Sequence, residues 1–485
     1  MSFLILVSFL LGVATGNQDA RTAYPMIIEE RTEDGALLLH VHDGVSLSLT
    51  KVKVATEALR LRSSTNGREI NQIINGTEIQ STLFEDRRRM ATVSLIRTPN
   101  GIKVTGLLSP TERIEPSLSE ARQALGRIPH IVRNIQRPVG SRHLRIERGK
   151  DTLPGICRGN YVPDNVTVEL FVVSDEVHNR RFERDDLWRY ICIFINSINA
   201  IFMSLSCPRV SLALVGLEIS SKIAETQYVY GSDKQMNDQF TLYNLKDYVG
   251  RKMRAYGNPD VVLLLTGRDV YESTGRGIRK DITGIAFEGG VCTDHCVALA
   301  EDIPGSFSGI IDAAHELGHS LGASHDGSPP NRYIRDHPGS LKCRAESGHL
   351  MTYVDGGPLR YQFSQCNQEE IRYVLSIRGK KCWDINAVNF YSLKDVYPGA
   401  LINPNDFCKR FYKNNAAHSP ADPFLRSHCK MECCAVLRKN TLTCALHHML
   451  DDMWCDYGKK CFQGVCTSGM HWYPYGSKKF SRRNK

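Results

Sequence analysis

The spacing of hydrophobic residues changes along the chain and divides it into regions that predict different structures. Before about residue 150, hydrophobic and polar residues alternate. Residues 36–49 predict two strands around an Asp43-Gly44 turn, and the pair 92–96 and 102–108 predicts a second hairpin around Pro99-Asn100-Gly101. This region, about 17–148, contains no cysteine and therefore predicts a small β-rich unit.

From about residue 155 to 385, short apolar strands alternate with helical patterns. The predicted strands are 166–175, 210–219 and 261–267, and the predicted helices are 183–204 and 244–256. Residues 284–287 predict an edge strand that could accept an extended peptide. A last helix is expected to begin at Asn367, with a cap of the Asn-x-x-Glu form. This alternation predicts an α/β domain with a mainly parallel sheet covered by helices.

One stretch of this α/β region, residues 315–326, carries the candidate chemistry. It contains His315, His319 and His325 in the pattern H-E-x-x-H-x-x-G-x-x-H. Histidines four residues apart share one face of a helix, and Gly322 permits the left-handed turn that returns the third histidine. Three neutral imidazoles with a fourth position open for water suit a catalytic Zn²⁺, and Glu316 is placed to take a proton from that water.

The surroundings of the motif bear on whether it is a real site. A bare H-E-x-x-H also arises by chance on a surface helix, as two solvated histidines and a glutamate. The added glycine and third histidine at fixed spacing disfavour that alternative. The preceding residues, 306–314, offer Ser306 and Ser308 as helix caps and apolar positions at near-helical spacing. The sequence therefore predicts a buried amphipathic helix that carries the first two ligands.

A second signal follows the motif, at His349-Leu350-Met351-Thr352-Tyr353. Together the two segments resemble the metzincin zinc endopeptidases, in which a methionine-bearing turn lies beneath the zinc, and Met351 is the matching residue. A core methionine that fills a gap is the alternative. Asp326, directly after the third histidine, narrows the resemblance to the reprolysin branch, which includes snake-venom, ADAM and ADAMTS-type proteases. The layout, with a Cys-rich tail behind the protease, most resembles the secreted reprolysin-type metalloproteases of tick saliva.

Tyr353 departs from the usual turn of the venom enzymes and has two interpretations. In astacin-type relatives a tyrosine at that offset approaches the zinc, and the alternative is a plain wall of the substrate cleft.

The reprolysin resemblance also implies a structural Ca²⁺ opposite the active site. Residues 168–170, 264–269 and 363–366 resemble reprolysin segments, and Glu169 and Asp260 match two carboxylate ligands of that ion. A further ligand is not identified, because Ile385 stands where the family has one. A pair of buried-edge carboxylates with lysine or arginine partners is the alternative.

The 16 cysteines are distributed unevenly. None precedes Cys157, eight lie between Cys157 and Cys382, and eight lie between Cys408 and Cys466. These even counts predict two separately closed disulfide sets in an oxidising compartment. The 292–296 segment allows a second metal site or, preferably in a secreted chain, a disulfide-tethered loop with His295 exposed near the cleft. Low apolar content between the later cysteines predicts a small disulfide-rich loop domain over 386–485.

The ends of the chain predict its destination. Residues 1–16 have the apolar run and small residues of a signal peptide, and no later apolar run is long enough for a membrane anchor. Asn75 and Asn165 are glycosylation acceptors in a secreted chain. The net charge of +9 favours acidic matrix surfaces, and no nucleic-acid-binding module is visible. The basic tail 478–485 could bind sulfated glycans or a protein exosite, or could be a solvated end.

The domain order implies processing. By position and resemblance, 17–148 is a pro-domain that assists folding and occludes the cleft, ahead of a protease domain over 155–385. Cleavage by a furin-like enzyme is expected after Arg145 or Arg148, with 87–89 as a rival basic site. Because the pro-domain has no cysteine, latency must be steric or use another ligand.

These observations predict a secreted zinc metalloendopeptidase made as a zymogen. By resemblance, its substrates would be extracellular proteins such as fibrinogen, fibrin and matrix proteins. The alternative is a binding protein that acts through the Cys-rich tail on an inactive protease scaffold. Loss of Glu316 or of a histidine would favour that alternative, but all four residues are present.

Overall fold

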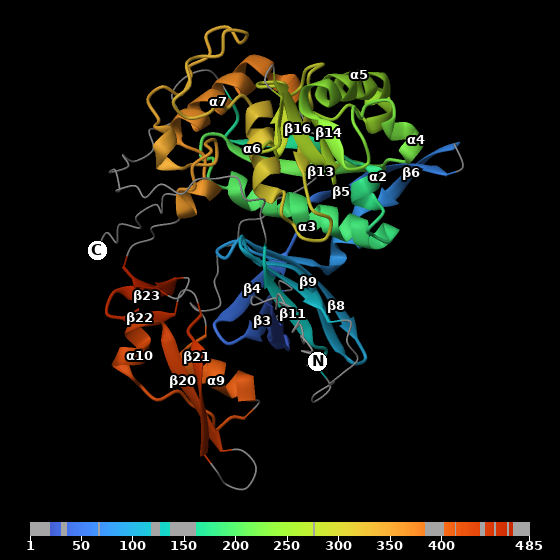
Figure 1. The fold of residues 1–485 in the computed structure, drawn as a ribbon. Coiled ribbons are helices and arrows are strands. Elements are labelled where there is room, and N and C mark those ends of the chain that lie inside the picture. Colours follow the sequence, from blue (N-terminus) through green and yellow to red (C-terminus); the bar gives the residue numbers. More distant parts are fainter. Residues whose placement is uncertain are drawn as a thin grey trace, which may run out of the picture.

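A computed structural model provides the structure of the chain. It describes residues 20–30, 36–65, 68–117, 127–135, 162–274, 277–383, 402–412, 414–436, 442–450, 453–462 and 465–468. Figure 1 shows a helix-rich part that contains α5, α6 and α7 above a β-rich N-terminal part, with the C-terminal part beside the latter. The predicted signal peptide, the basic segment with Arg145 and Arg148, and the basic tail lie outside the described residues.

The N-terminal part is built around an antiparallel nine-stranded sheet. Its order is β1-β11-β10-β9-β8-β7-β4-β3-β2. The strands are β1 (Arg21–Ala23), β2 (Met26–Glu30), β3 (Leu37–His42), β4 (Val45–Lys51), β7 (Leu83–Asp86), β8 (Ala91–Thr98), β9 (Gly101–Ser109), β10 (Glu112–Pro116) and β11 (His130–Asn134). Both predicted hairpins are confirmed: β3 pairs with β4, and β8 pairs with β9. Gly44 and Gly101 have φ of 92° and 125°, conformations that favour glycine at these turns.

The helix-rich part contains a seven-stranded sheet of order β18-β19-β15-β12-β13-β5-β6. Its strands are β5 (Ala55–Thr65), β6 (Arg68–Asn75), β12 (Asn165–Ser174), β13 (Arg209–Ile219), β15 (Val261–Thr266), β18 (Gly284–Ala286) and β19 (Val297–Glu301). The neighbours from β19 through β5 pair in parallel, whereas β18 and β6 are antiparallel edges. Most strand pairs of the described chain are antiparallel, so the predicted mainly parallel arrangement does not hold beyond the middle of this sheet.

Helices lie on both faces of the seven-stranded sheet. They are α1 (Gly76–Ile79), α2 (Glu176–Asn179), α3 (Arg184–Phe202), α4 (Lys222–Glu225), α5 (Asp238–Tyr256), α6 (Ile310–Ser320) and α7 (Gln365–Arg378). Successive residues of a strand point to opposite faces. Leu170 and Val172 accordingly join a core with α3 and α6, whereas Phe171 and Val173 join a core with α5. In Figure 1, α5 lies above and α3 below strands β13 and β5 of this sheet.

Smaller elements complete this part of the molecule. A three-stranded sheet contains β14 (Gln235–Asn237), β16 (Asp269–Thr274) and β17 (Gly277–Arg279). Short 3₁₀ helices are η1 (Gln80–Thr82), η3 (Ala345–Ser347), η4 (Gly357–Tyr361) and η5 (Lys380–Cys382).

Two predicted helix starts are wrong. The helix expected from residue 244 begins at Asp238, where Asn237 accepts a hydrogen bond from the backbone N–H of Phe240 at 2.9 Å. The last helix begins at Gln365, because Ser364 rather than Asn367 is its cap. Asn367 is the third helical residue and closes a capping box with Ser364.

The region 17–148 is β-rich, as expected, but its strands belong to two sheets. It contributes β5 and β6 to the seven-stranded sheet, where β5 pairs in parallel with β13. The sequence did not predict either strand or β19.

The C-terminal part is not only loops. It contains α9 (Pro404–Tyr412), α10 (Pro423–Ser427), β20 (Lys430–Val436), β21 (Leu442–His448), β22 (Trp454–Asp456), β23 (Lys459–Phe462) and β24 (Val465–Thr467). Its disulfides form the predicted closed set: Cys408–Cys433, Cys429–Cys461, Cys434–Cys444 and Cys455–Cys466. Within the described residues, no helix is long and apolar enough to cross a bilayer.

The earlier cysteines do not form a closed set. Disulfides join Cys292 to Cys382 and Cys343 to Cys366, and Cys207 is also disulfide-bonded. Cys192 and Cys296 are free and buried. The prediction of an even, fully paired set is therefore wrong for this block.

Candidate metal centre and active site

Helix α6 presents two of the three motif histidines. Its apolar residues Ile311, Ala314 and Leu317 are buried against the sheet and α3, as the helical spacing predicts. The predicted serine cap is wrong: Gly309 occupies the cap position, and its backbone N–H donates to Oδ1 of Asp302 at 2.9 Å. A carboxylate at the helix start also interacts favourably with the helix dipole.

The chain leaves α6 at Gly322 and returns His325. Gly322 has φ of 105°, and its N–H donates to the carbonyl of His319 at 2.8 Å. A Cβ added at this position would lie 2.3 Å from Cγ2 of Val374. Both the backbone conformation and the close approach of α7 therefore require glycine here.

The three motif histidines converge on one point. Nε2 of His325 lies 3.0 Å from Nε2 of His315 and 3.2 Å from Nε2 of His319. With Zn–N bonds of ~2.0–2.1 Å, nitrogens at neighbouring corners of a tetrahedron would be about 3.3 Å apart. The triad therefore fits a zinc ion, with only small adjustments of the rings.

The other ring nitrogens orient two of the ligands. Nδ1 of His315 lies 2.8 Å from the Leu350 carbonyl, and Nδ1 of His319 lies 2.7 Å from the Ala323 carbonyl. A carbonyl only accepts, so each Nδ1 carries the proton and each Nε2 presents a lone pair. Burial lowers the pKa of His315 to about 4 and that of His319 well below its usual value, with the other triad histidines contributing. Neutral imidazoles are the form that binds a metal.

Glu316 lies beside the triad and faces the edge strand. It is 7% exposed, and its Cγ lies 2.6 Å from where a Cβ on Gly284 of β18 would be. Burial, followed by the charge of Asp312, raises the pKa of Glu316 well above its usual value. Among the described residues, no hydrogen bond occupies its carboxylate. A carboxylate of raised basicity without a protein partner suits a general base.

Met351 packs against Gly318, which lies between His315 and His319 on α6. It is fully buried, and its Sδ is 2.8 Å from where a Cβ on Gly318 would be. Its carbonyl accepts from the N–H of Asp326 at 3.0 Å. Asp326 is itself buried and accepts from the Ser364 hydroxyl at 2.6 Å. The Met351 turn is thus tied to the segment that carries His325.

Tyr353 is exposed to solvent and lies beside the triad. Its ring centroid is 4.7 Å from that of His325 and 6.2 Å from that of His315, and its side chain is 72% exposed. Partial desolvation, followed by the charge of Glu316, raises the pKa of Tyr353. The ring therefore borders the triad from solvent, and this position is compatible with both interpretations of the residue.

The predicted calcium residues are neighbours: Glu169 lies within β12, and Asp260 directly precedes β15. The Glu169 N–H donates to Oδ2 of Asp260 at 2.8 Å, and the Asp260 N–H donates to the Glu169 carbonyl at 2.9 Å. Burial and the Glu169 carboxylate raise the pKa of Asp260 to about 7. No lysine or arginine pairs with Asp260 in the described part of the chain. Glu169 is buried and Asp260 is half-buried, and carboxylate oxygens suit calcium. The residues on either side of Ile385, Asp384 and Asn386, lie outside the described residues.

The 292–296 segment is a disulfide-held loop rather than a second metal site. Cys292 bonds to Cys382, not to the free and buried Cys296. The His295 side chain is 43% exposed and pairs with Asp294.

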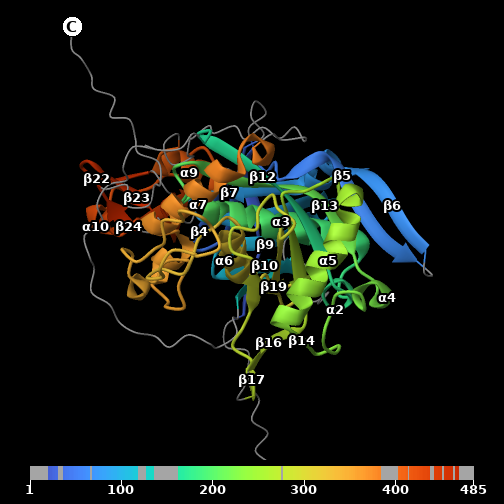
Figure 2. The same cartoon turned by 90° about the horizontal axis from the view of Figure 1, so that it is seen from above.

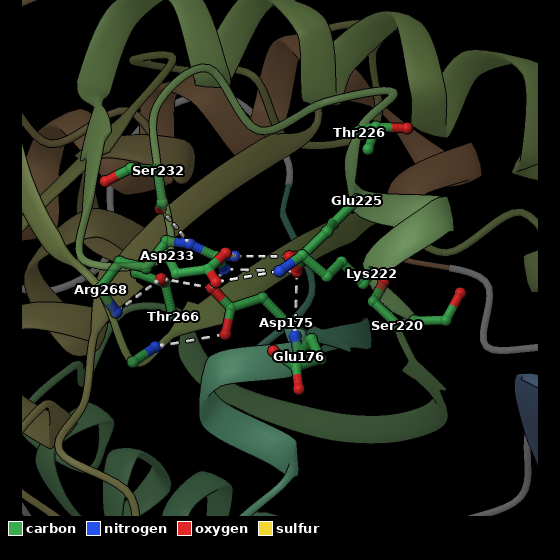
Figure 3. Close-up of polar contacts among 12 residues, drawn as sticks. Asp175, Glu176, Ser220, Lys222, Glu225, Thr226, Ser232, Asp233, Thr266 and Arg268 are labelled. Atoms are coloured by element: carbon green, nitrogen blue, oxygen red, sulfur yellow. Dashed lines mark hydrogen bonds and ion pairs between the residues drawn. The ribbon is translucent and has the colours of Figure 1, made fainter.

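The sequence did not predict a buried ion-pair cluster that joins the ends of β12 and β15 to α4 (Figure 3). Arg268, which follows β15, is 3% exposed. Its Nη1 lies 2.6 Å from Asp175 at the end of β12, and its Nη2 lies 2.5 Å from Glu225 in α4. Its Nε donates to the Ser232 carbonyl at 2.8 Å. The only sequence signal was the resemblance of residues 264–269 to reprolysins.

Comparison with known proteins agrees with this geometry. Residues 188–326 match the model of the metallo-peptidase family M12B, reprolysin-like. A silkworm (Bombyx mori) protein named "A disintegrin and metalloproteinase with thrombospondin motifs like" is 30% identical over 259 residues, which cover 50% of this chain and 36% of that protein. The scorpion (Olivierus martensii) "Venom metalloproteinase BumaMPs1" is 24% identical over 64% of this chain and 78% of its own. Mouse "Disintegrin and metalloproteinase domain-containing protein 19" is 27% identical over 61% of this chain and 28% of its own length.

The fold and the histidine triad are typical of a metallopeptidase. Over residues 188–326 the chain matches the reprolysin-like family M12B, as the resemblance predicted. Family M12B is zinc-dependent, and the matches support a metalloendopeptidase activity.

Proposed function

We propose that this protein is a secreted zinc metalloendopeptidase, made as a zymogen, that hydrolyses extracellular proteins. The observation that carries the proposal is the convergence of three Nε2 atoms. Two of these histidines donate Nδ1–H to carbonyls, so their Nε2 lone pairs both face Nε2 of His325. Three imidazoles whose Nε2 atoms meet at one point suit a shared cation.

The mechanism follows from the positions of Glu316 and β18. The antiparallel edge strand β18 offers free backbone groups to an extended substrate, which would run past Glu316. Zinc, when bound to the triad, would polarise the scissile carbonyl and acidify the attacking water. Glu316 takes the proton of that water and passes it to the leaving amine. His315 and His319 are held in the ligand tautomer by the carbonyls of Leu350 and Ala323.

Location and substrates are proposed on separate grounds. At least six disulfides in the described residues are typical of an extracellular protein, and the predicted signal peptide agrees. Fibrinogen, fibrin and matrix proteins are proposed as substrates from the resemblance alone. The likeness to tick salivary enzymes is proposed on the same basis. A Ca²⁺ held by Glu169 and Asp260, and glycan contact through the basic tail, are parts of the same proposal.

A second candidate function, binding through the Cys-rich tail, is favoured by one observation. Phe424, Trp454 and Tyr457 of this part are 72%, 62% and 100% exposed. Exposed aromatic side chains are common in protein-binding surfaces. Such binding is compatible with catalysis, because these residues lie in the C-terminal part and not at the triad.

Digestion of fibrinogen and casein, followed on gels, tests the proposed activity. The wild-type chain, cut before the protease domain, is compared with Glu316→Gln and with the exposed-site control Glu346→Gln. Loss of general-base catalysis should lower the rate by about 10²–10⁴-fold in Glu316→Gln only, and a zinc chelator should abolish wild-type cleavage. Unchanged cleavage by Glu316→Gln, or in the chelator, would refute the proposed mechanism.

A further inference from the structure

The N-terminal part shares a sheet with the protease. Strand β5 pairs in parallel with β13, with Arg60, Leu61 and Arg62 opposite Gly216, Leu217 and Glu218. Just before β5, the carbonyl of Val54 accepts from the N–H of Leu214 at 2.8 Å. Figure 2 shows β13, β5 and β6 side by side at one end of the sheet. Without β5, the backbone groups of β13 that it pairs would have no partner at that edge.

The two parts also share one hydrophobic core. Val54, Leu59 and Leu61 are at most 1% exposed and lie in the same buried cluster as β12, β13 and α3. A second contact lies between β9 and the region before α6, where Leu107 and Phe307 line one pocket. Separation of the two parts would expose this apolar surface to water, which is unfavourable.

Buried polar groups of the protease are satisfied from the N-terminal side. Glu218 is 3% exposed, accepts from the hydroxyl of Tyr256 at 2.7 Å, and has Nε of Arg62 at 3.6 Å. Asn196 of α3 is 1% exposed, and its Nδ2 donates to Glu85 at 2.8 Å and to Thr92 at 3.1 Å. Removal of the N-terminal part would leave Asn196 without these acceptors. Glu218 would lose Arg62 and keep only Lys252 of α5, 3.5 Å away, as an ion-pair partner among the described residues.

The Cys-rich tail holds the same N-terminal part from its other side. Leu38 of β3 lies in one buried cluster with Phe407 of α9. The His40 ring packs edge-on against Phe411 with centroids 5.2 Å apart, and Arg410 forms an ion pair with Glu29. In Figure 1 the C-terminal part lies beside β3 and β4 rather than beside α6.

These interactions lie away from the catalytic centre. Within the described residues, the strand pairings and hydrogen bonds of the N-terminal part reach β13, α3 and the turn before α6, where Arg113 donates to the Gly305 carbonyl at 3.1 Å. They do not reach the histidine triad. The expectation that this region occludes the cleft therefore stays a prediction.

From these contacts we infer that residues 20–135 are a lasting subunit of the protease rather than a detachable pro-domain. After a cut between residues 135 and 162, they remain bound, and the mature enzyme has two chains. The inference rests on the proposed function in one respect: natural cleavage between residues 135 and 162 belongs to the zymogen proposal. The test uses an engineered cleavage site instead, so the inference and the proposed function can be refuted independently.

The test replaces residues 142–147 of the full chain with a thrombin site and follows the cut protein by gel filtration. Both pieces should co-elute in native buffer and in 1 M NaCl, because a shared apolar core is not screened by salt. In urea the two pieces should separate only at concentrations at which the tryptophan fluorescence of the protease piece shows that it unfolds. Elution of the N-terminal piece alone in native buffer, with a folded protease piece, would overturn the inference. Neither readout requires peptidase activity.

A matched pair of variants tests the contact itself. Arg62→Gln removes the cation that the N-terminal part places beside buried Glu218 and leaves Lys252 of α5 there. Arg97→Gln removes an exposed arginine that pairs with Glu30 within the N-terminal part. The urea midpoint for separation of the cut protein should fall in Arg62→Gln and stay at the wild-type value in Arg97→Gln. Equal midpoints in the two variants would contradict the assigned contact. If uncut Arg62→Gln fails to fold, the wild-type co-elution decides the inference.

Discussion

Replacement of Arg268 by methionine should be among the most destabilising single changes in the protease part. The side chains of Asp175 and Glu225 are 0% and 4% exposed, and both pair with this one guanidinium (Figure 3). Methionine keeps much of the volume but leaves two buried carboxylates without a cation. Breaking a buried pair in this way costs about 3–5 kcal/mol. At 2–4 °C per kcal/mol for a domain of 150–250 residues, Tm should fall by roughly 6–20 °C.

The dependence of this loss on pH gives a second check. Burial already raises the pKa of Glu225, and loss of Arg268 should raise it further. A carboxyl whose pKa is raised by folding loses stability as pH rises above its unfolded value, ~4.3. The deficit of Arg268→Met measured by thermal unfolding should therefore be larger at pH 8 than at pH 5.

Two controls accompany the Arg268 measurement. Arg180→Met breaks an exposed pair with Glu176, 3.6 Å long, and should cost less than about 1 kcal/mol. The triple change Arg268→Met, Asp175→Asn and Glu225→Gln removes the stranded charges and should recover part of the stability. A Tm of Arg268→Met within 2 °C of wild type, or a deficit independent of pH, would refute the reasoning.

Three further predictions concern separate features. Gly322→Ala, which forces an alanine to φ of 105° against Val374, should displace His325 and weaken zinc binding at least tenfold in chelator competition; unchanged affinity would contradict the assigned turn. Calcium should raise the Tm of the wild type but not of Asp260→Asn, and an equal shift in both would exclude this site. Folding lowers the pKa of His40 to about 4, so protection of β3 from hydrogen exchange should fall as pH drops from 6.5 towards 4 in the wild type; persistence of this loss in His40→Gln would contradict its origin.

The sequence predicted most of the site because its residues lie close together in the chain. His315, Glu316 and His319 share one helix, and Gly322 and His325 follow within a few residues, so helical geometry and glycine conformation suffice. Met351 was found by resemblance. The cap of α6 was not predicted correctly. The group that accepts from the N–H of Gly309 is Asp302, which precedes the helix by more than a turn.

Features that depend on distant residues were missed. Nothing local in 55–65 shows that this strand pairs with β13, about 150 residues later, instead of with the N-terminal sheet. The Arg268 cluster joins three segments in the same way. Cysteine counts failed for Cys192 and Cys296, because an even number does not require that every thiol pair.

The zinc content of the purified protein tests the central claim most directly. Elemental analysis of the wild type should find one zinc per chain, and His319→Ala should hold markedly less, while Glu316→Gln keeps the full amount. Absence of zinc from folded wild-type protein supplied with the metal, or equal zinc in His319→Ala, would contradict the assigned centre.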